Sequence, residues 1–169
     1  MRKFNSIYGE TLVEPEPLLS STPRIKGLDG NDKMGKSLGN AIFLADNEAT
    51  IAKKVMGAIT DPQKIKKDDP ANPDICMVYY YHKLIDSKNL DDICVECKKG
   101  ERGCVACKKE LIHNMMEFLK PIHEKRTYYE MHPEVVDEVL LNGTEEARKK
   151  AQEVMSKVRK NVKIDYFDD

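Results

Sequence analysis

The sequence predicts a mainly helical fold, with a helical bundle over residues 46–169 that is preceded over residues 1–45 by the trailing edge of an α/β domain. Two observations predict this division. From Asp46 onward, apolar residues recur every three or four positions, which is the period of an amphipathic helix. Residues 1–45 are instead rich in proline and glycine and offer at most a short strand around Ile25. The length of 169 residues suffices for one domain and a remnant of a second.

Capping residues and prolines predict the boundaries of the first helices. Asp46 is expected to cap a helix that ends at the Thr60-Asp61-Pro62 segment. A charged loop follows over residues 63–71, and Asn72-Pro73 then opens a helix that runs to about residue 85. The expected apolar face of the first helix consists of Ile51, Val55 and Ile59.

Three more helices are expected toward the carboxyl terminus. A long helix carries Leu111, Met115, Phe118, Leu119 and Ile122 on one face, and Pro121 should kink or divide it. His132-Pro133 opens the next helix, and Asn142-Gly143-Thr144 should end it and cap a final one. We expect these helices to pack together as a bundle. The apolar positions of the last two are Val135, Val136, Val139, Leu140, Ala147, Ala151, Val154, Met155, Val158 and Val162.

The composition excludes several classes of protein. The formal net charge is −1, so any contact with nucleic acid must come from local patches rather than from a polycationic chain. The first residues lead into an acidic, proline-rich stretch instead of a signal peptide, and no apolar run is long enough to span a bilayer. We therefore expect a cytoplasmic protein with no membrane contact, whose five cysteines are thiols or ligands rather than disulfides.

The most informative segment is a glycine-punctuated loop with the run Lys33-Met34-Gly35-Lys36-Ser37. Short residues let the backbone approach a ligand closely. Two ammonium groups on flexible stems suit a polyphosphate whose negative charge grows during a reaction. The run therefore predicts phosphate binding, but a basic loop is ordinarily solvated surface, and these five residues alone leave both interpretations open.

The same run resembles the KMSKS signature of class I aminoacyl-tRNA synthetases, with Gly35 where that family usually has serine. The neighbouring segments resemble tryptophanyl-tRNA synthetases in particular, namely residues 13–19, 23–30, 60–62, 69–76 and 111–162. The resemblance covers nearly the whole chain and implies the carboxyl-terminal half of such an enzyme. Residues 1–45 would then be a remnant of the Rossmann-like catalytic domain with its KMSKS-type loop. Residues 46–169 would be a helical domain that binds the tRNA anticodon.

The resemblance also implies an activity and residue roles. The complete enzyme would be a tryptophan–tRNA ligase, which activates tryptophan with ATP and transfers it to tRNA(Trp). Lys33 and Lys36 would be catalytic and would hold the β- and γ-phosphates. Met34, Gly35 and Ser37 would complete the ATP-binding loop, with backbone N–H groups, including that of Gly35, donating to phosphate. Mg²⁺ would accompany ATP.

Other parts of that enzyme are expected to lie upstream. The four histidines, His82, His113, His123 and His132, are not arranged in the His-x-Gly-His motif of class I synthetases. The tryptophan pocket would also precede this chain, so Met1 is expected to be a fragment boundary and the chain alone to be inactive in tryptophan activation. The full-length enzyme would be a homodimer through contacts largely in the missing half, which leaves a monomeric fragment as an open alternative.

Five cysteines form the second strong pattern. Cys94 and Cys97, followed after six residues by Cys104 and Cys107, are two Cys-x-x-Cys units whose thiolates can converge on one metal. This spacing favours zinc first, an iron–sulfur cluster second and unligated thiols last. The resemblance to cluster-bearing bacterial tryptophanyl-tRNA synthetases implies a structural [4Fe–4S] cluster on Cys76, Cys97, Cys104 and Cys107, with Cys94 as the alternative fourth ligand.

Basic residues mark candidate tRNA contacts, although a charged helix face is more often simply solvated. They lie beside the cysteines and on the last helix, and those we assign are Lys98, Lys99, Lys108, Lys109, Lys149 and Lys150. Tyrosines at helical spacing are expected to be mostly core rather than base-stacking platforms.

Two alternative functions stay open on the sequence. One is a self-standing, metal-stabilised helical module that binds RNA without catalysis. The other is a fragment of the related tyrosyl-tRNA synthetase, because the amino-acid pocket that would decide between the two enzymes is not in this sequence.

Overall fold

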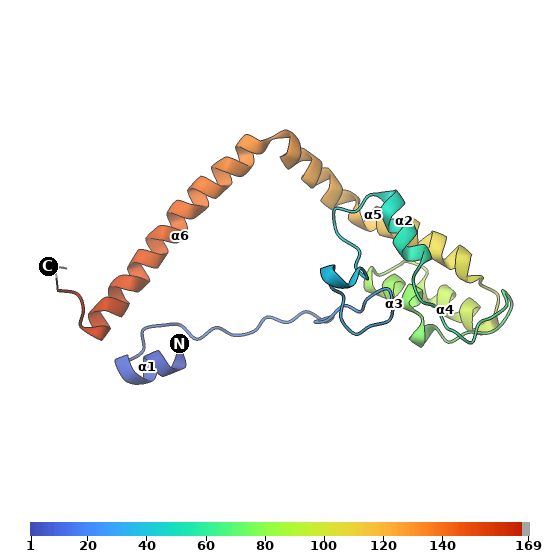
Figure 1. Ribbon diagram of the computed structural model, residues 1–169, viewed down its shortest axis with the longest axis horizontal. Coiled ribbons are helices and arrows are strands. Elements are labelled where there is room, and N and C mark those ends of the chain that lie inside the picture. Colours follow the sequence, from blue (N-terminus) through green and yellow to red (C-terminus); the bar gives the residue numbers. More distant parts are fainter. Residues whose placement is uncertain (167–169) are drawn as a thin grey trace. The chain divides into compact units, whose positions relative to one another are not determined.

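The computed structural model describes residues 1–166, and among these it contains helices and no β-strand. The predicted helical fold class is therefore confirmed. Ile25, where we expected at most a short strand, lies in irregular backbone. The chain forms two compact units, one over residues 21–126 and one that combines residues 1–20 with the segment from Thr127 onward (Figure 1). These units are defined by compactness, so the functional boundary predicted between residues 45 and 46 stays a prediction.

The unit of residues 21–126 is built from short helices and one long one. Its elements are the 3₁₀ turns η1 (Lys36–Leu38) and η2 (Pro73–Ile75), the α-helices α2 (Glu48–Met56), α3 (Met77–Leu84) and α4 (Leu90–Lys99), and most of α5 (Cys104–Met131). Helices α2, α3 and α4 gather along the first part of α5 (Figure 1). Their buried side chains form one hydrophobic cluster, which confirms the expected bundle for these helices. Its members are Leu28, Ile51, Val55, Ala58, Cys76, Val78, Tyr81, Ile93, Cys107, Leu111, Met115 and Leu119.

The boundaries of α2 differ slightly from those predicted. Asn47, not Asp46, caps the helix, because its side-chain oxygen accepts a hydrogen bond from the Thr50 N–H at 2.9 Å. Asp46 instead accepts from the Phe43 N–H at 2.9 Å and forms an ion pair with Lys54. The helix ends at Met56, so the next predicted apolar residue of its face, at position 59, lies beyond the helix.

The Asn72-Pro73 signal is confirmed as a start, with one interruption. The Asn72 side chain accepts from the Asp74 N–H at 3.0 Å and caps η2, and α3 follows after Cys76. Helix α4 was not predicted, although it carries two of the cysteines. It ends at Gly100, which has a φ of +79°, and a Cβ there would lie 2.2 Å from the Asp68 carbonyl oxygen. Only glycine fits this position without strain.

Pro121 lies inside α5 and does not divide it. The division that we allowed for was therefore wrong, and the predicted kink stays a prediction. Of the predicted apolar face, Leu111, Met115 and Leu119 are buried, whereas Phe118 is half exposed.

The second unit contains α1 (Arg2–Tyr8), the end of α5 and α6 (Pro133–Val162). The predicted break at Asn142-Gly143-Thr144 is wrong, since α6 runs through it without interruption. An interior glycine costs a helix only about 1 kcal/mol relative to alanine, which is less than the loss of the hydrogen bonds of a broken turn. None of the α6 side chains is buried, so the predicted bundle packing is not observed for this helix. Among residues 1–166, no helix is both long and apolar enough to cross a membrane.

Candidate functional site

The run Lys33–Ser37 lies in a loop whose start is anchored by α3. The Tyr81 hydroxyl donates to the Lys26 carbonyl at 2.6 Å, and the Tyr80 hydroxyl accepts from the Lys26 N–H at 3.4 Å. Tyr81 is only 2% exposed and belongs to the core as expected. Tyr128 and Tyr129 are each 47% exposed, so the same expectation is wrong for these two tyrosines. A backbone hydrogen bond from Met34 to the Ile25 carbonyl, 3.0 Å long, closes the loop.

The Asn40 side chain forms hydrogen bonds to three residues of this loop, and the sequence analysis missed it. Its Nδ2 donates to Asp29 Oδ1 at 2.9 Å and to the Lys33 carbonyl at 3.2 Å. Its Oδ1 accepts from the Gly35 N–H at 3.0 Å. Its own carbonyl accepts from the Leu28 N–H at 3.0 Å, and the residue is 5% exposed. The loop therefore depends on a residue outside the five-residue run.

Asp29 accepts hydrogen bonds from both sides of the loop. Besides the Asn40 amide, its carboxylate accepts from the Asn31 N–H at 3.1 Å and from Asn31 Nδ2 at 2.6 Å. These bonds, that from Asn40 foremost, lower the pKa of Asp29 below its ordinary value of 3.8, and the carboxylate is therefore ionised at neutral pH. Gly27 lies against this group, since a Cβ at Gly27 would lie 2.2 Å from Asn40 Nδ2 and 2.4 Å from Asp29 Oδ1.

The residues of the run are not all equally available to a ligand. Lys33, Lys36 and Ser37 are exposed, and Ser37 lies within η1. Met34 is partly buried and packs against the hydrophobic cluster. The Gly35 N–H, which we expected to donate to phosphate, is bonded to Asn40 here. The two ammonium groups and the Ser37 hydroxyl are thus the ligand-accessible groups of the run in this structure.

A cavity of about 870 Å³ borders the loop. Leu38, Gly39, Asn40 and Asp29 line it on one side, and residues of α2, Lys53 among them, line it on the other. The cavity is of the size that takes a small molecule or a segment of another chain.

The sequence-predicted cysteines come from three helical elements. Cys76 joins η2 to α3 and is 8% exposed, Cys97 lies on α4, and Cys104 and Cys107 lie in the first turn of α5. All five cysteines are free thiols, and Cys94 is one turn before Cys97 on α4. A structural metal site that links helices takes its ligands from different elements, as these cysteines would provide.

Burial and neighbouring groups raise the pKa of three of these thiols. Burial raises the pKa of Cys76, and the neighbouring Cys104 thiolate raises it further. Burial also raises the pKa of Cys97, with added repulsion from Cys76, Cys104 and Cys94 and an opposing effect of Lys64. Burial raises the pKa of Cys107 to about 12, where Arg102 opposes the shift and Cys76 and Cys97 add to it. The thiols of Cys76, Cys97 and Cys107 are therefore neutral at pH 7, and a bound cation would be needed to favour their thiolate forms.

The cysteines are nevertheless not closed around a point. Among residues 1–166, no group of three or more His, Cys, Asp or Glu side chains is placed to hold a metal ion as it stands. Cys94 interacts with Cys97 on the same helix and with Tyr79 on α3. Burial raises the pKa of Tyr79 to about 12, and the hydrogen bond with Cys94 raises it further.

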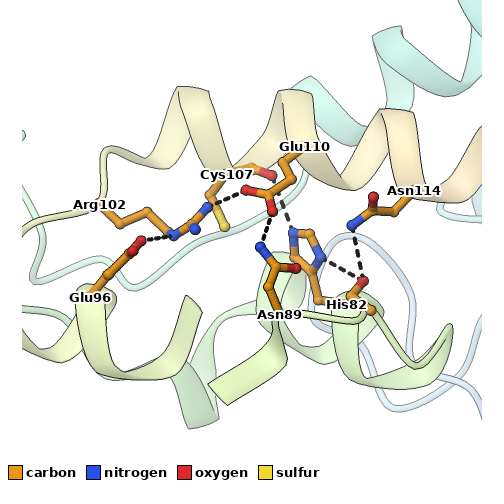
Figure 2. Close-up of polar contacts among 8 residues, drawn as sticks. His82, Asn89, Glu96, Arg102, Cys107, Glu110 and Asn114 are labelled. Atoms are coloured by element: carbon orange, nitrogen blue, oxygen red, sulfur yellow. Dashed lines mark hydrogen bonds and ion pairs between the residues drawn. The ribbon is translucent and has the colours of Figure 1, made fainter. Parts of the chain in front are cut away.

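A polar network lies next to the cysteines and holds α4 and α5 together (Figure 2). Arg102, in the turn between these helices, donates from Nε to Glu96 Oε2 at 2.8 Å and from a terminal nitrogen to Glu110. Asn89 donates to the other oxygen of Glu110. This arrangement fixes the turn that separates Cys97 from Cys104.

His82 forms the other half of the network and is fully buried. Its Nε2 lies 3.2 Å from the Cys107 carbonyl, which can only accept, so Nε2 carries the proton and Nδ1 accepts from the Ser87 hydroxyl at 2.9 Å. Asn114 Nδ2 donates to the same hydroxyl oxygen at 3.3 Å (Figure 2). Burial lowers the pKa of His82, so the ring is neutral at physiological pH and acts as a structural link between α3 and α5.

The candidate tRNA-contacting lysines have different environments. Lys98, Lys99 and Lys109 are exposed, whereas Lys108 donates to the Met56 carbonyl at 2.8 Å. On α6, Lys149 and Lys150 are exposed and pair with Glu145 at 4.0 Å and Glu153 at 3.0 Å, respectively.

A second cavity collects lysines that the sequence analysis did not select. It has a volume of about 590 Å³ and lies between the loop after Thr60 and the start of α5. Lys109 is the one assigned lysine in its wall, together with Lys64, Lys66 and Lys67. Ile65, also in the wall, is 86% exposed. The only available signal was the density of lysines in that loop.

Comparisons with known proteins agree with these features. The sequence model of the family described as tRNA synthetases class I (W and Y) matches residues 1–120. Tryptophan–tRNA ligases of Aquifex aeolicus and Thermotoga maritima are 44% and 38% identical to this chain, each over 96% of it. The structure of tryptophanyl-tRNA synthetase from Campylobacter jejuni, complexed with ADP and tryptophan, matches 95% of the chain with a TM-score of 0.79 and 28% identity.

The chain spans about half the length of the relatives it matches. It covers 42% of the Aquifex aeolicus protein and 50% of the Thermotoga maritima protein, and 50% of the Campylobacter jejuni chain. The family match includes the anchored loop with its two lysines and all five cysteines, and it extends over well more than half of the chain. This chain therefore belongs to the class I aminoacyl-tRNA synthetase family of the tryptophan and tyrosine enzymes.

Proposed function

We propose that this chain is the carboxyl-terminal part of a tryptophan–tRNA ligase, in which residues 1–45 complete the ATP site and residues 46–169 form a tRNA-binding helical domain. The observation that carries the proposal is the loop that exposes Lys33 and Lys36 on an anchored backbone within a chain whose relatives are tryptophan–tRNA ligases. The names of these relatives favour tryptophan over tyrosine, and the upstream half of the enzyme would supply the amino-acid pocket.

The reaction has two steps. The tryptophan carboxylate attacks the α-phosphorus of ATP, and the bond from this phosphorus to the oxygen that bridges it to the β-phosphate breaks. The products are tryptophanyl-adenylate and pyrophosphate. A terminal ribose hydroxyl of tRNA(Trp) then attacks the activated carbonyl and releases AMP. Mg²⁺ bound with ATP would neutralise part of the triphosphate charge.

Lys33 and Lys36 would act in the first step. Their ammonium groups would bind the β- and γ-phosphates and stabilise the charge that develops on the departing pyrophosphate. Such a contact contributes about 3–4 kcal/mol to the barrier when it is made mainly in the transition state. Ser37 would donate a hydrogen bond from its exposed hydroxyl, and Met34 would serve by anchoring the loop to the core.

Measurement of tryptophan-dependent ATP–pyrophosphate exchange tests this role in the synthetase that contains this chain. Lys36→Ala should lower kcat roughly 100- to 1,000-fold and leave the KM for tryptophan nearly unchanged. Lys88→Ala, at an exposed lysine outside the loop, is the matched control and should behave as the wild type. Equal exchange rates for Lys36→Ala and the control would refute the assignment.

We also propose that Cys76, Cys97, Cys104 and Cys107 hold a structural [4Fe–4S] cluster. The donor set fits, because the four cysteines come from three neighbouring helical elements that pack in one unit, and thiolates are the ligands that iron–sulfur clusters use. A bound cluster would neutralise the repulsion among the thiolates and tie α3, α4 and α5 together. Zn²⁺ is the alternative occupant, with Cys94 as the alternative fourth ligand.

Elemental and sulfide analysis of anaerobically purified protein decides the occupant. Iron with acid-labile sulfide supports the cluster, and zinc alone supports the alternative. With either metal, Cys76→Ser should lose it and Cys94→Ser should keep it if Cys76 is the fourth ligand. Loss in Cys94→Ser alone would reverse that assignment.

For tRNA, we propose phosphate contacts from the lysines beside the cysteines, namely Lys98, Lys99, Lys108 and Lys109, with weaker contributions from Lys149 and Lys150. The second cavity supports a contact near Lys109, because three more lysines share its wall with an exposed apolar side chain. Lys109→Ala should reduce tRNA affinity and its dependence on salt, since a lost phosphate contact releases one fewer counterion.

A further inference from the structure

We propose that Asn40 is a positioning residue for the phosphate-binding loop: its side-chain amide, held by Asp29, fixes the backbone between Lys33 and Lys36 before any ligand binds. The proposal rests on the proposed function, since it concerns the loop that would bind the ATP phosphates. It assigns a role to a residue outside the five-residue run.

The Asn40 amide is fully used by the loop. An asparagine side chain has two N–H donors, and here they go to Asp29 Oδ1 at 2.9 Å and to the Lys33 carbonyl at 3.2 Å. Its oxygen accepts from the Gly35 N–H at 3.0 Å. The residue is 5% exposed, so these bonds are shielded from water and leaving any of them unmade would be costly.

The two loop contacts enclose the segment that separates the lysines. One is to the carbonyl of Lys33 itself, and the other is to the N–H of Gly35, the residue immediately before Lys36. One rigid amide plane thus sets the relative direction of the two peptide groups that flank Met34 and carries the chain from Lys33 to Gly35 in a fixed course. Lys36 follows directly after the point that is fixed.

Asp29 holds the amide in place from the other side. Its carboxylate also accepts two hydrogen bonds from Asn31, so its orientation does not depend on Asn40 alone. Gly27 leaves the room that this pair needs, since a Cβ there would lie 2.2 Å from Asn40 Nδ2. The remaining anchor is Met34, whose side chain packs on the hydrophobic cluster and whose N–H donates to Ile25.

A loop that is ordered in advance loses less conformational freedom when it binds the triphosphate. Positioning of groups that act in the transition state affects kcat more than ground-state binding. Because the Gly35 N–H is bonded to Asn40, the charged side chains rather than this peptide group are offered to the phosphates. Loss of the tie should therefore lower kcat for adenylate formation roughly 10- to 100-fold with little change in the KM for tryptophan.

Two measurements on Asn40→Ala test the proposal. Hydrogen exchange of the Gly35 amide, measured by NMR on the 169-residue chain, should accelerate at least about tenfold relative to wild type because its acceptor is gone. ATP–pyrophosphate exchange by the whole synthetase should fall as stated. Asn47→Ala is the matched control, because Asn47 lines the same cavity and caps α2 without touching the loop, and it should leave Gly35 exchange unchanged.

A second variant keeps the test informative if Asn40→Ala does not fold. Asn40→Asp retains the acceptor for the Gly35 N–H but loses both donors and places a second carboxylate beside Asp29. It should impair kcat, while Gly35 amide exchange should stay closer to wild type than in Asn40→Ala.

The outcomes separate this proposal from the function on which it rests. If Lys36→Ala lowers exchange but Asn40→Ala does not, or if Asn40→Ala raises kcat, the positioning role is overturned while the phosphate role of the loop stands. If Lys36→Ala leaves exchange unchanged, the proposed function itself fails.

Discussion

Arg102 should be among the residues on which the stability of the 21–126 unit depends most. Its guanidinium is 12% exposed and bridges Glu96 on α4 to Glu110 on α5 (Figure 2). Arg102→Met keeps most of the aliphatic stem and removes both charge-assisted hydrogen bonds. It also leaves Glu110 with Asn89 as its remaining donor in this network.

The size of the effect follows from the exposure of the partners. Breaking a fully buried ion pair costs about 3–5 kcal/mol, but an exposed pair contributes about 0–1 kcal/mol. The Glu110 and Glu96 side chains are 28% and 41% exposed, so water can recover part of their solvation when the arginine is lost. We therefore expect a loss of about 2 kcal/mol in the free energy of unfolding at pH 7.

The effect should depend on pH with a definite sign. Burial raises the pKa of Glu110, but the bonds from Asn89 and Arg102 outweigh burial and lower it below its ordinary value of 4.5. A carboxyl with a lowered pKa contributes stability that is complete above its unfolded pKa and is lost as pH falls through its folded pKa. The difference between wild type and Arg102→Met should thus be greatest above pH 4.5 and should shrink below it.

Urea unfolding followed by far-ultraviolet circular dichroism, at pH 7 and at a pH below 4, measures both quantities. Arg148→Met, at an exposed position of α6, is the matched control and should change the midpoint little. A loss below about 0.5 kcal/mol at pH 7 would refute the view that this network holds α4 to α5. A loss that grows as pH falls would refute the role given to Glu110.

Three other predictions address core packing, two helix glycines and the close approach of Gly27 to the loop. Leu111→Ala removes a fully buried side chain from the centre of the cluster and should lower the free energy of unfolding by about 3–4 kcal/mol in the same urea assay. Gly100→Ala places a Cβ 2.2 Å from the Asp68 carbonyl oxygen at a positive φ, and it should lower the free energy of unfolding by about 2 kcal/mol. Nothing lies within 4 Å of a Cβ at Gly143, so Gly143→Ala should instead stabilise α6 by up to about 1 kcal/mol. Gly27→Ala, by crowding the Asn40 amide, should speed Gly35 amide exchange as Asn40→Ala does, and normal protection of that amide would show that the loop does not depend on this close approach.

Local features of this protein were predictable from the sequence because their causes are local. The Asn72-Pro73 start lies within one or two residues of the helix turn it caps, so the pattern predicted it correctly. The apolar face of α5 was likewise visible in the helical period at Leu111, Met115 and Leu119. The paired lysines and the Cys-x-x-Cys units were visible because their chemistry depends on close spacing.

Predictions failed where a local signal competed with longer-range structure. Asn142-Gly143 has the composition of a helix stop, yet α6 continues because the turns on both sides outweigh one glycine. Helix α4 was missed although Leu90, Ile93, Cys94 and Cys97 recur at helical spacing, because its two cysteines were interpreted as metal ligands rather than as part of an apolar helix face.

The sequence by itself determined the helical class, the charged loop and the set of thiols, since each is a property of neighbouring residues. Only the tertiary structure decided what holds that loop in place. Asn40 lies eleven positions from Asp29, and no period or motif joins them; the pairing exists because Gly27 leaves space and burial requires every amide atom to find a partner. The same reason applies to His82 and Cys107, which lie 25 positions apart and meet only when α3 packs on α5.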